Sequence, residues 1–300
     1  MVRVAYRPEY HHPLPEGHRF PMEKYTLLPE QLLYEGALTE ENFFAPEPVS
    51  EELITQVHTP DYWHRLKNGL LTPREERKTG FPHSPGLMHR EVIIMGGTVE
   101  ATGYALAHGV SLNIAGGTHH AFTDRGEGFC LLNDIALGAR HLLNTGMAKQ
   151  VLVVDLDVHQ GNGTAQIFKD EPKVFTFSMH GRDNYPLHKE HSDLDVELAT
   201  GTTDAEYLAL LDAHLPRLFS EVKPDFVFYQ CGVDVLATDK LGHLALTLPG
   251  CRERDRRVLA LCHQKQIPVV ASMGGGYSER IADIVEAHAN TFRLCVGLWG

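Results

Sequence analysis

The fold of this chain is decided by one stretch, Val151-Leu-Val-Val-Asp155-Leu-Asp157-Val-His159-Gln-Gly161-Asn162-Gly163. Its first four residues are apolar and include three valines, which predicts a strand buried on both faces. Asp155, Asp157 and His159 follow at alternate positions, and such side chains share one face of an extended chain. Two carboxylates and an imidazole at the end of a buried strand are typical of a metal site in an α/β protein. The simpler alternative is that these charged residues at the strand end only cap the next helix. We disfavour it because burying unpaired charges without a cation costs free energy.

Strands and helices alternate on both sides of this stretch. Strands are predicted at Val2–Tyr6, Ser111–Ala115, Gln150–Asp155, Lys173–Met179, Phe226–Gln230, Leu244–Thr247 and Val269–Ser272. Helices are predicted at Met22–Tyr34, Ser50–Gln56, Thr59–Asn68, Leu87–Ala107, Asp134–Leu143, Thr164–Phe168, Thr203–Phe219, Cys251–Gln264 and Ser278–Cys295. The segment Thr72–Ser84 and the segment after Met179 are expected to be loops. This alternation predicts one α/β domain over residues 1–300, a three-layer sandwich whose mostly parallel sheet carries helices on both faces.

Composition narrows the range of functions. A net charge of −12 without clusters of Lys and Arg argues against direct nucleic-acid binding. The five cysteines are scattered and never in C-x-x-C spacing, which favours free thiols in a reducing compartment. No long apolar run or signal peptide is present, so we expect a cytoplasmic protein without a membrane span.

Three further loops at predicted strand ends carry reactive side chains. Gly116-Gly-Thr-His-His120 offers tandem histidines, which alone are compatible with metal ligands, an acid/base pair or a coincidence. Tyr229-Gln-Cys-Gly-Val-Asp234 ends in a carboxylate, and Gly274-Gly-Gly-Tyr277 delivers a phenol. Two carboxylates and one imidazole would form an open zinc site, from Asp157, His159 and Asp234. His119 and His120 would then transfer protons and Tyr277 would stabilise an oxyanion, which suits hydrolysis of an amide.

These segments, with Asp124–Cys130 and Phe177–His180, make the chain resemble the zinc-dependent histone deacetylases of the arginase/deacetylase superfamily, above all their class IV-like and bacterial branch. The string Asp-Leu-Asp-Val-His-Gln-Gly-Asn-Gly is highly specific. The resemblance implies a single zinc ion and removal of acetyl or longer acyl groups from lysine side chains of proteins or peptides. Acetylated polyamines and other small acyl amines are alternative substrates for the same chemistry.

The resemblance also implies a role for individual residues. Asp157, His159 and Asp234 match the family's zinc ligands. His119 and His120 match its tandem histidines, the second of which is the general base, and Tyr277 matches the tyrosine that polarises the acyl carbonyl. Asp155 matches an aspartate that orients the first histidine, which fits the rule that outer partners fix imidazole tautomers.

Other positions matched by the family concern a second ion and the subtype. Asp155 and Ser178 fall where the family often binds structural potassium. Asn162 replaces an aspartate found in other classes, and it marks the class IV-like branch. Since an amide stabilises an imidazolium less than a carboxylate does, we expect His120 to be less basic here.

The substrate tunnel and its rim are the last features that the resemblance predicts. Gly128 and Phe129 match one wall, Tyr185 the opposing wall and Leu241 the rim, with ordinary packing as the alternative for each. Arg19 could line the mouth or lie on the surface. His180 and His188 follow the strand Lys173–Met179, where a rim position is conceivable.

Two rival functions share some of these features. A binuclear manganese ureohydrolase such as an arginase needs an Asp-x-His-x-Asp pattern, but Gly161 stands where the second acid is required. A catalytically silent binder of acylated ligands would not need the complete set of histidines, ligands and Tyr277. Both rivals are therefore disfavoured.

Overall fold

The computed structural model describes residues 1–300 and contains one sheet of eight strands. The strands lie in the order β2-β1-β3-β8-β7-β4-β5-β6, and every neighbouring pair is parallel. Their bounds are β1 Arg3–Ala5, β2 Phe43–Phe44, β3 Val110–Asn113, β4 Val151–Asp155, β5 Val174–Gly181, β6 Leu194–Leu198, β7 Phe226–Gln230 and β8 Val269–Ser272. This confirms the predicted α/β class with a parallel sheet.

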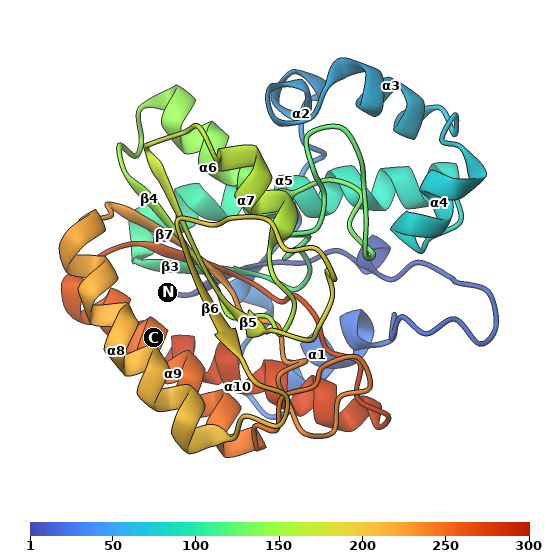
Figure 1. The fold of residues 1–300 in the computed structure, drawn as a ribbon. Coiled ribbons are helices and arrows are strands. Elements are labelled where there is room, and N and C mark those ends of the chain that lie inside the picture. The colour runs from blue at the N-terminus through green and yellow to red at the C-terminus, as the bar shows by residue number, and fades with distance from the viewer.

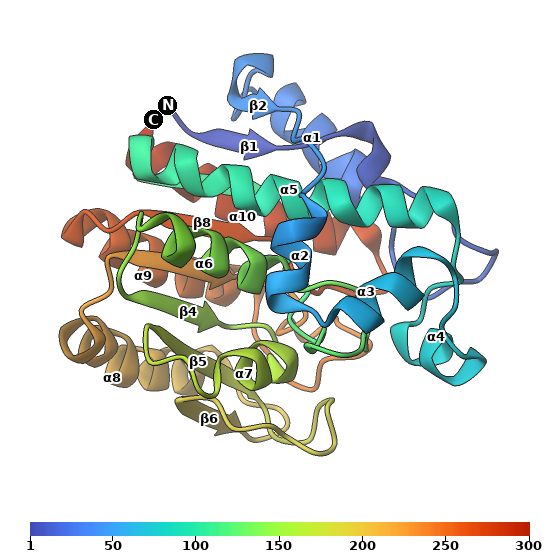
Figure 2. The same ribbon diagram turned by 90° about the horizontal axis from the view of Figure 1, so that it is seen from above.

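The helices form a layer on each face of the sheet (Figures 1 and 2). One layer contains α2 Glu51–Val57, α5 Pro85–His108, α6 Asp134–Thr145 and α7 Asn162–Phe168. The other contains α1 Lys24–Tyr34, α8 Asp204–Val222, α9 Leu248–Lys265 and α10 Ile281–Trp299. The short helices α3 Pro60–Lys67 and α4 Pro73–Thr79 lie beyond the end of the sheet in Figure 2.

Several predicted elements are wrong. The segment expected as a loop at Thr72–Ser84 contains α4, because Thr72 and Glu75 form a capping box, Pro73 occupies the first turn and Gly80 ends the helix with a left-handed backbone. The strand expected at Leu244–Thr247 is only an isolated bridge between Leu236 and Leu246. The edge strands β2 and β6 were not predicted, since both are short or half exposed and carry a weak apolar signal.

The central strands position the site. β3, β4, β7 and β8 are buried along their whole length and lie beside one another. Their carboxyl ends therefore bring four loops together at one edge of the sheet, where ligands bind in folds of this class.

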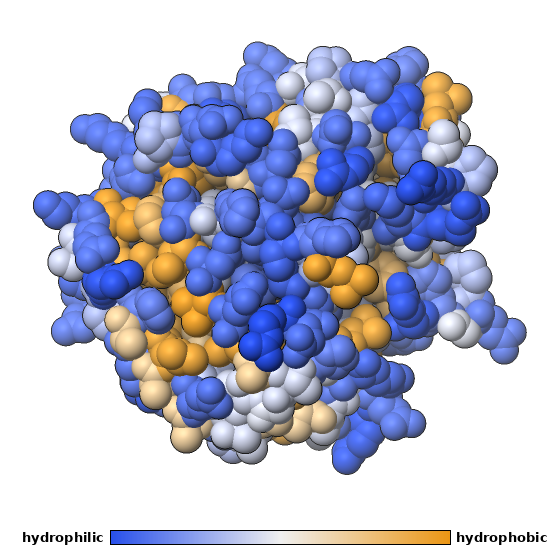
Figure 3. All heavy atoms as spheres, in the orientation of Figure 1, coloured by the Kyte–Doolittle hydropathy of each residue, from blue (hydrophilic) through white to orange (hydrophobic).

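The face of the molecule shown in Figure 3 is mainly hydrophilic, with an apolar area toward the left, over the region where Figure 1 shows the strands beside α8. Among the helices, none combines the length and apolar composition required to cross a membrane.

Candidate active site

The three expected metal ligands converge at the ends of two adjacent strands. Asp157 and His159 follow β4 and Asp234 follows β7, and all three side chains are buried. One potential ligand atom from each lies within 4.8 Å of the others. The His159 Nδ1 atom is 3.1 Å from Asp157 Oδ1 and 3.1 Å from Asp234 Oδ2. Because Nδ1 carries at most one proton, it cannot donate to both carboxylates, whereas a cation between the three atoms would satisfy all of them.

The shifted pKa values of these buried side chains also show that the group attracts positive charge. Burial and the neighbouring charge of Asp157 raise the pKa of the Asp234 carboxyl to about 7. Burial alone would lower the pKa of His159, but hydrogen bonds to the two carboxylates raise it to about 10. Donor atoms bonded to tetrahedral zinc at about 2 Å are roughly 3.3 Å apart, close to the spacing found here. The donor set of one nitrogen and two oxygens therefore fits a zinc ion with a position left open for water or substrate.

Main-chain groups and glycines hold the two carboxylates. Gly275 N donates to Asp157 Oδ2 at 2.8 Å, and Val158 N donates to Asp234 Oδ1 at 2.9 Å. A Cβ atom on Gly232 would lie 2.0 Å from Asp157 Oδ2, and one on Gly275 would lie 2.0 Å from Asp234 Oδ2. Both glycines are thus required by the close approach of backbone to carboxylate. One oxygen of each carboxylate remains free to face His159.

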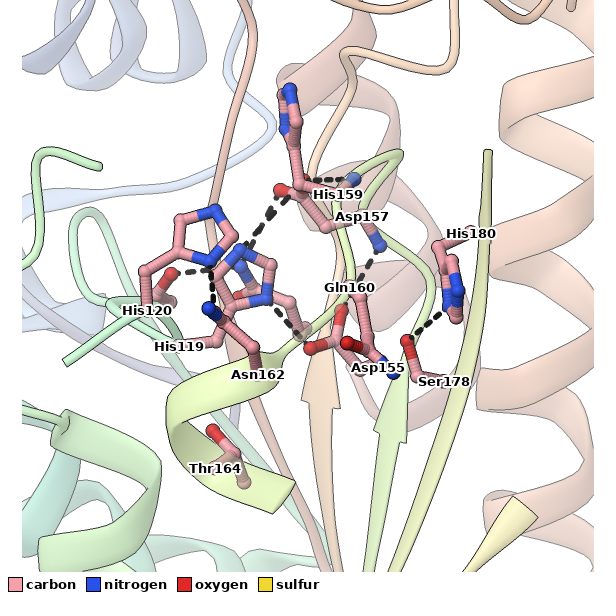
Figure 4. Close-up of polar contacts among 12 residues, drawn as sticks. His119, His120, Asp155, Asp157, His159, Gln160, Asn162, Thr164, Ser178 and His180 are labelled. Carbon is pink, nitrogen blue, oxygen red and sulfur yellow. Dashed lines mark hydrogen bonds and ion pairs between the residues drawn. The ribbon is translucent and has the colours of Figure 1, made fainter. Parts of the chain in front are cut away.

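The tandem histidines follow β3 and lie beside this group (Figure 4). His119 Nδ1 is 2.6 Å from Asp155 Oδ2, and His120 Nδ1 is 2.6 Å from Asn162 Oδ1. Since the amide and carboxylate oxygens only accept, each Nδ1 carries a proton and each Nε2 is directed away from these partners. A Cβ on Gly161 would lie 2.3 Å from Asp155 Oδ2, so no acid fits at that position.

The two histidines differ in charge because their partners differ. Burial lowers the pKa of His119, but the Asp155 carboxylate outweighs this effect and raises that pKa to about 9. Burial and the nearby rings of His119 and His159 lower the pKa of His120 well below its usual value. His120 is therefore the neutral member of the pair, with an Nε2 lone pair available as a base.

Tyr277 follows β8 and closes the other side of the site. Its backbone N–H donates to Asp239 Oδ2 at 2.6 Å, and its ring centroid is 5.9 Å from that of Phe129. Burial and the charges of Asp234 and Asp157 raise the pKa of its phenol. The phenol is thus a proton donor at neutral pH.

A cavity of about 440 Å³ leads from the surface to His120, His159 and Tyr277. The four predicted tunnel residues all line it, Gly128, Phe129, Tyr185 and Leu241. The Tyr185 ring stands perpendicular to that of His120 with centroids 4.9 Å apart. Arg19 also lines the mouth of this cavity, which was one of the two positions that the sequence left open for it.

His180 and the expected potassium position near Asp155 and Ser178 are two features that do not contribute to the cavity. His180 lies within β5, is fully buried and contacts the Ser178 hydroxyl at 2.9 Å, so of the two positions left open for it the rim is excluded. Ser178 lies opposite Asp155 in the strand register (Figure 4), but their contacts are satisfied by protein groups. A potassium ion at this point stays a prediction.

Sequence reasoning missed three charged side chains that support the site, of which Lys24 and Arg254 are buried and Asp239 is half-buried. Lys24 on α1 donates to Gly274 O at 3.1 Å, and burial lowers the pKa of its ammonium to about 8. Arg254 on α9 binds main-chain oxygens of the ligand loops. Asp239 accepts from the backbones of Tyr277 and two residues at the mouth. Only Asp239 carries a local signal, as an acid in a Gly-containing turn.

The chain is similar to known deacetylases in sequence and in fold. An uncharacterized protein of Picosynechococcus sp. is 47% identical over 286 residues, which cover 95% of each chain. Histone deacetylase 2 of Arabidopsis thaliana is 30% identical over 277 residues, covering 89% of this chain and 72% of that protein. The crystal structure of an HDAC homolog complexed with SAHA has a TM-score of 0.85 at 24% identity and covers 99% of this chain and 84% of that one. The Histone deacetylase domain model matches residues 18–292, and the chain belongs to the histone deacetylase family.

Proposed function

We propose that this protein is a zinc-dependent amidohydrolase that removes acetyl groups from lysine side chains. The family and the relatives support a deacetylase function. The proposal that zinc is used and that acetyl-lysine is the substrate rests mainly on one observation. One imidazole and two carboxylates converge beside a neutral histidine at the inner end of the cavity. All five cysteines are free and buried, which supports the expected reducing compartment, the cytoplasm.

Asp157, His159 and Asp234 are the residues that would hold the zinc ion. When bound, zinc lowers the pKa of a water molecule and polarises a carbonyl group. An acid at Gly161, as a binuclear site requires, would collide with Asp155. The chain's own residues therefore support one ion.

His120 is the proposed general base. Its Nδ1–H is held by the Asn162 amide oxygen, which leaves Nε2 to take the proton of the attacking water and pass it to the departing amine. His119 stands beside it with Asp155 as partner, and its positive charge stabilises the negative charge that develops on the substrate.

Tyr277 supplies the neutral hydrogen-bond donor. Its raised phenol pKa keeps the proton in place, so the hydroxyl donates to the developing oxyanion of the acyl carbonyl. The ring also packs between Phe129 and Phe20, whose centroids are 5.9 and 6.2 Å away. This packing orients the phenol toward the site.

The space behind the site favours a short acyl group. A cavity of about 40 Å³ lies beside Gly116–His120 and Gly274–Tyr277, and Phe20, Tyr25, Phe81 and Ile94 contribute to its walls. One water molecule needs about 10–15 Å³ of such cavity volume, so this cavity has room for about three water molecules. That volume suits an acetyl group better than a long acyl chain.

Hydrolysis of an acetyl-lysine peptide by the zinc-loaded protein tests this proposal, with the metal content measured in parallel. His120→Ala and Tyr277→Phe should each keep one zinc per chain and lose most activity, because neither side chain is a ligand. Wild-type activity in both variants would contradict the mechanism. Two manganese ions per chain would contradict the single-metal site.

A further inference from the structure

The mouth of the active-site cavity has its own charge pattern. Above His120, His159 and Tyr277 the rim consists of mixed polar and apolar side chains, Arg19, Lys78, Glu127, Asn184, Leu241 and His243. Two of them are permanent cations and one is a carboxylate. This balance contrasts with the net charge of −12 for the whole chain.

The one carboxylate at the rim is fully engaged by the protein. Glu127 Oε1 accepts from Lys78 at 3.2 Å and from Arg125 at 2.8 Å, while Oε2 accepts from the Tyr185 hydroxyl at 2.6 Å. Burial alone would raise the pKa of Glu127, but these hydrogen bonds lower it. Glu127 therefore fixes the Tyr185 wall and leaves no acid at the rim to bind a cationic substrate.

Arg19 is the opposite case, because its charge has no partner. The guanidinium lies over the Phe129 ring, 5.2 Å from the centroid, and makes no hydrogen bond or ion pair within the protein. Its planar N–H donors are thus held beside the tunnel wall and remain open to solvent. Such a group is suited to bind a carboxylate through two parallel hydrogen bonds.

Acidic residues also occur in the adjoining hollow under the N-terminal loop. Glu16, Glu23 and Glu279 line that hollow together with Lys240, and Arg19 borders both spaces. None of the three forms an ion pair with Arg19. They consequently leave the hydrogen-bond donors of the Arg19 guanidinium free.

We propose that Arg19 selects acyl-lysine substrates that carry a carboxylate close to the modified side chain. The inference rests on the proposed deacetylase function. A lysine stem in the tunnel brings its Cα to the mouth, where a free α-carboxylate or a neighbouring acidic side chain can reach the guanidinium. An acetylated polyamine would place protonated amines near the unpaired Arg19 guanidinium instead, so the same rim disfavours that alternative.

Steady-state kinetics with matched substrates test the proposal. The substrates are acetyl-lysine peptides with a C-terminal lysine carboxylate or its amide, internal peptides flanked by Glu or by Lys, and an acetylated polyamine. Wild-type protein should favour the carboxylate partner of each pair by roughly fivefold in kcat/KM, mainly through KM, and added salt should weaken this preference.

Variants at position 19 isolate the guanidinium. Arg19→Gln should lower kcat/KM for the carboxylate substrates more than for their neutral partners and so abolish the preference, and Arg19→Glu should reverse the preference toward Lys-flanked peptides. Arg19→Lys should retain part of it. The matched control is Arg217→Gln, which removes an exposed arginine near the end of α8 that precedes β7, remote from the mouth. This control should behave like wild type.

The outcomes separate the two hypotheses. If the protein deacetylates peptides but prefers Lys-flanked or polyamine substrates, or if Arg19→Gln keeps the carboxylate preference, the role of Arg19 is overturned and the deacetylase function stands. If zinc-loaded wild-type protein hydrolyses none of the substrates, the proposed function is rejected, and the selection by Arg19 is rejected with it.

Discussion

Removing the Arg254 guanidinium is expected to loosen both loops that carry the metal ligands. Arg254 on α9 is fully buried, and its Nη1 donates to Leu156 O at 3.1 Å and to Gly232 O at 2.6 Å. Its Nη2 also donates to Cys231 O at 3.3 Å. Leu156 directly precedes Asp157, and Gly232 lies in the loop after β7. One side chain thus ties the β4 loop to the β7 loop from behind the site.

The magnitude follows from the partner of Arg254. Asp255 is also fully buried, and its Oδ1 is 2.7 Å from the guanidinium. Arg254→Met would leave this carboxylate without its cation, which typically costs about 3–5 kcal/mol. Tyr229 and Thr291 donate to Asp255 at 2.5 Å each and continue to stabilise the charge. We therefore expect a loss of about 3 kcal/mol in the free energy of unfolding, and a smaller loss when Asp255→Asn is added.

Two assays distinguish loop positioning from stability alone. Urea unfolding gives the change in stability, and competition with a chelator gives the zinc affinity of the folded variant. Arg254→Met should bind zinc about 10- to 100-fold more weakly than wild type, and Arg254→Lys should fall between the two. The control is Leu211→Ala in α8, where a buried cavity should cost about 2–5 kcal/mol without changing zinc affinity.

Two results would refute this reasoning. An unchanged urea midpoint for Arg254→Met would show that the buried ion pair contributes nothing net. A loss of stability with wild-type zinc affinity would show that Arg254 supports the fold but does not position the ligand loops.

Three further predictions address the histidines and the glycines. Asn162→Asp should raise the pKa of His120 and move the acidic limb of the kcat/KM–pH profile upward by about one unit; an unmoved limb would argue against His120 as the base. His58 is buried and its pKa is lowered to about 4 by burial, so its contribution is complete above pH 6.5 and is lost as the pH falls toward 4. Wild-type protein should lose about 3 kcal/mol of stability over that interval from this group, and His58→Gln should show a shallower dependence in urea unfolding. Gly275→Ala should abolish zinc binding, measured by metal content, because its Cβ would meet Asp234, while Gly103→Ala, whose Cβ meets no atom within 4 Å, should keep the metal.

The sequence predicted the fold class well because its strongest signals come from the buried central strands. Val151–Val154 is entirely apolar, and the same holds for most of β7 and β8. The edge strands lack such an apolar run, because β2 has only two residues and β6 alternates polar and apolar residues that are mostly half exposed. The order β3-β8-β7-β4 is a tertiary property, and no local pattern in the chain specifies it.

The candidate site was predictable residue by residue but not in its geometry. Alternation places Asp155, Asp157 and His159 on one face only if the strand continues through His159, whereas β4 ends at Asp155. Asp155 then pairs with His119, while Asp157 turns toward Asp234 from the neighbouring loop. Their separate roles arise because the chain bends after the strand and because β4 and β7 are adjacent.

The two missed cations, Lys24 and Arg254, share one physical property: their role depends on burial by distant parts of the chain. Lys24 and Gly274 are 250 positions apart, and Arg254 and Leu156 are 98 positions apart. In the sequence each is an ordinary charged residue of a helix, and such a side chain is usually exposed to solvent. Once buried, each cation must find acceptors, and main-chain carbonyls at the ends of the central strands are the groups within reach. Buried cations that bind loop carbonyls are therefore where further determinants of this site should be sought, because those contacts control where the ligands lie.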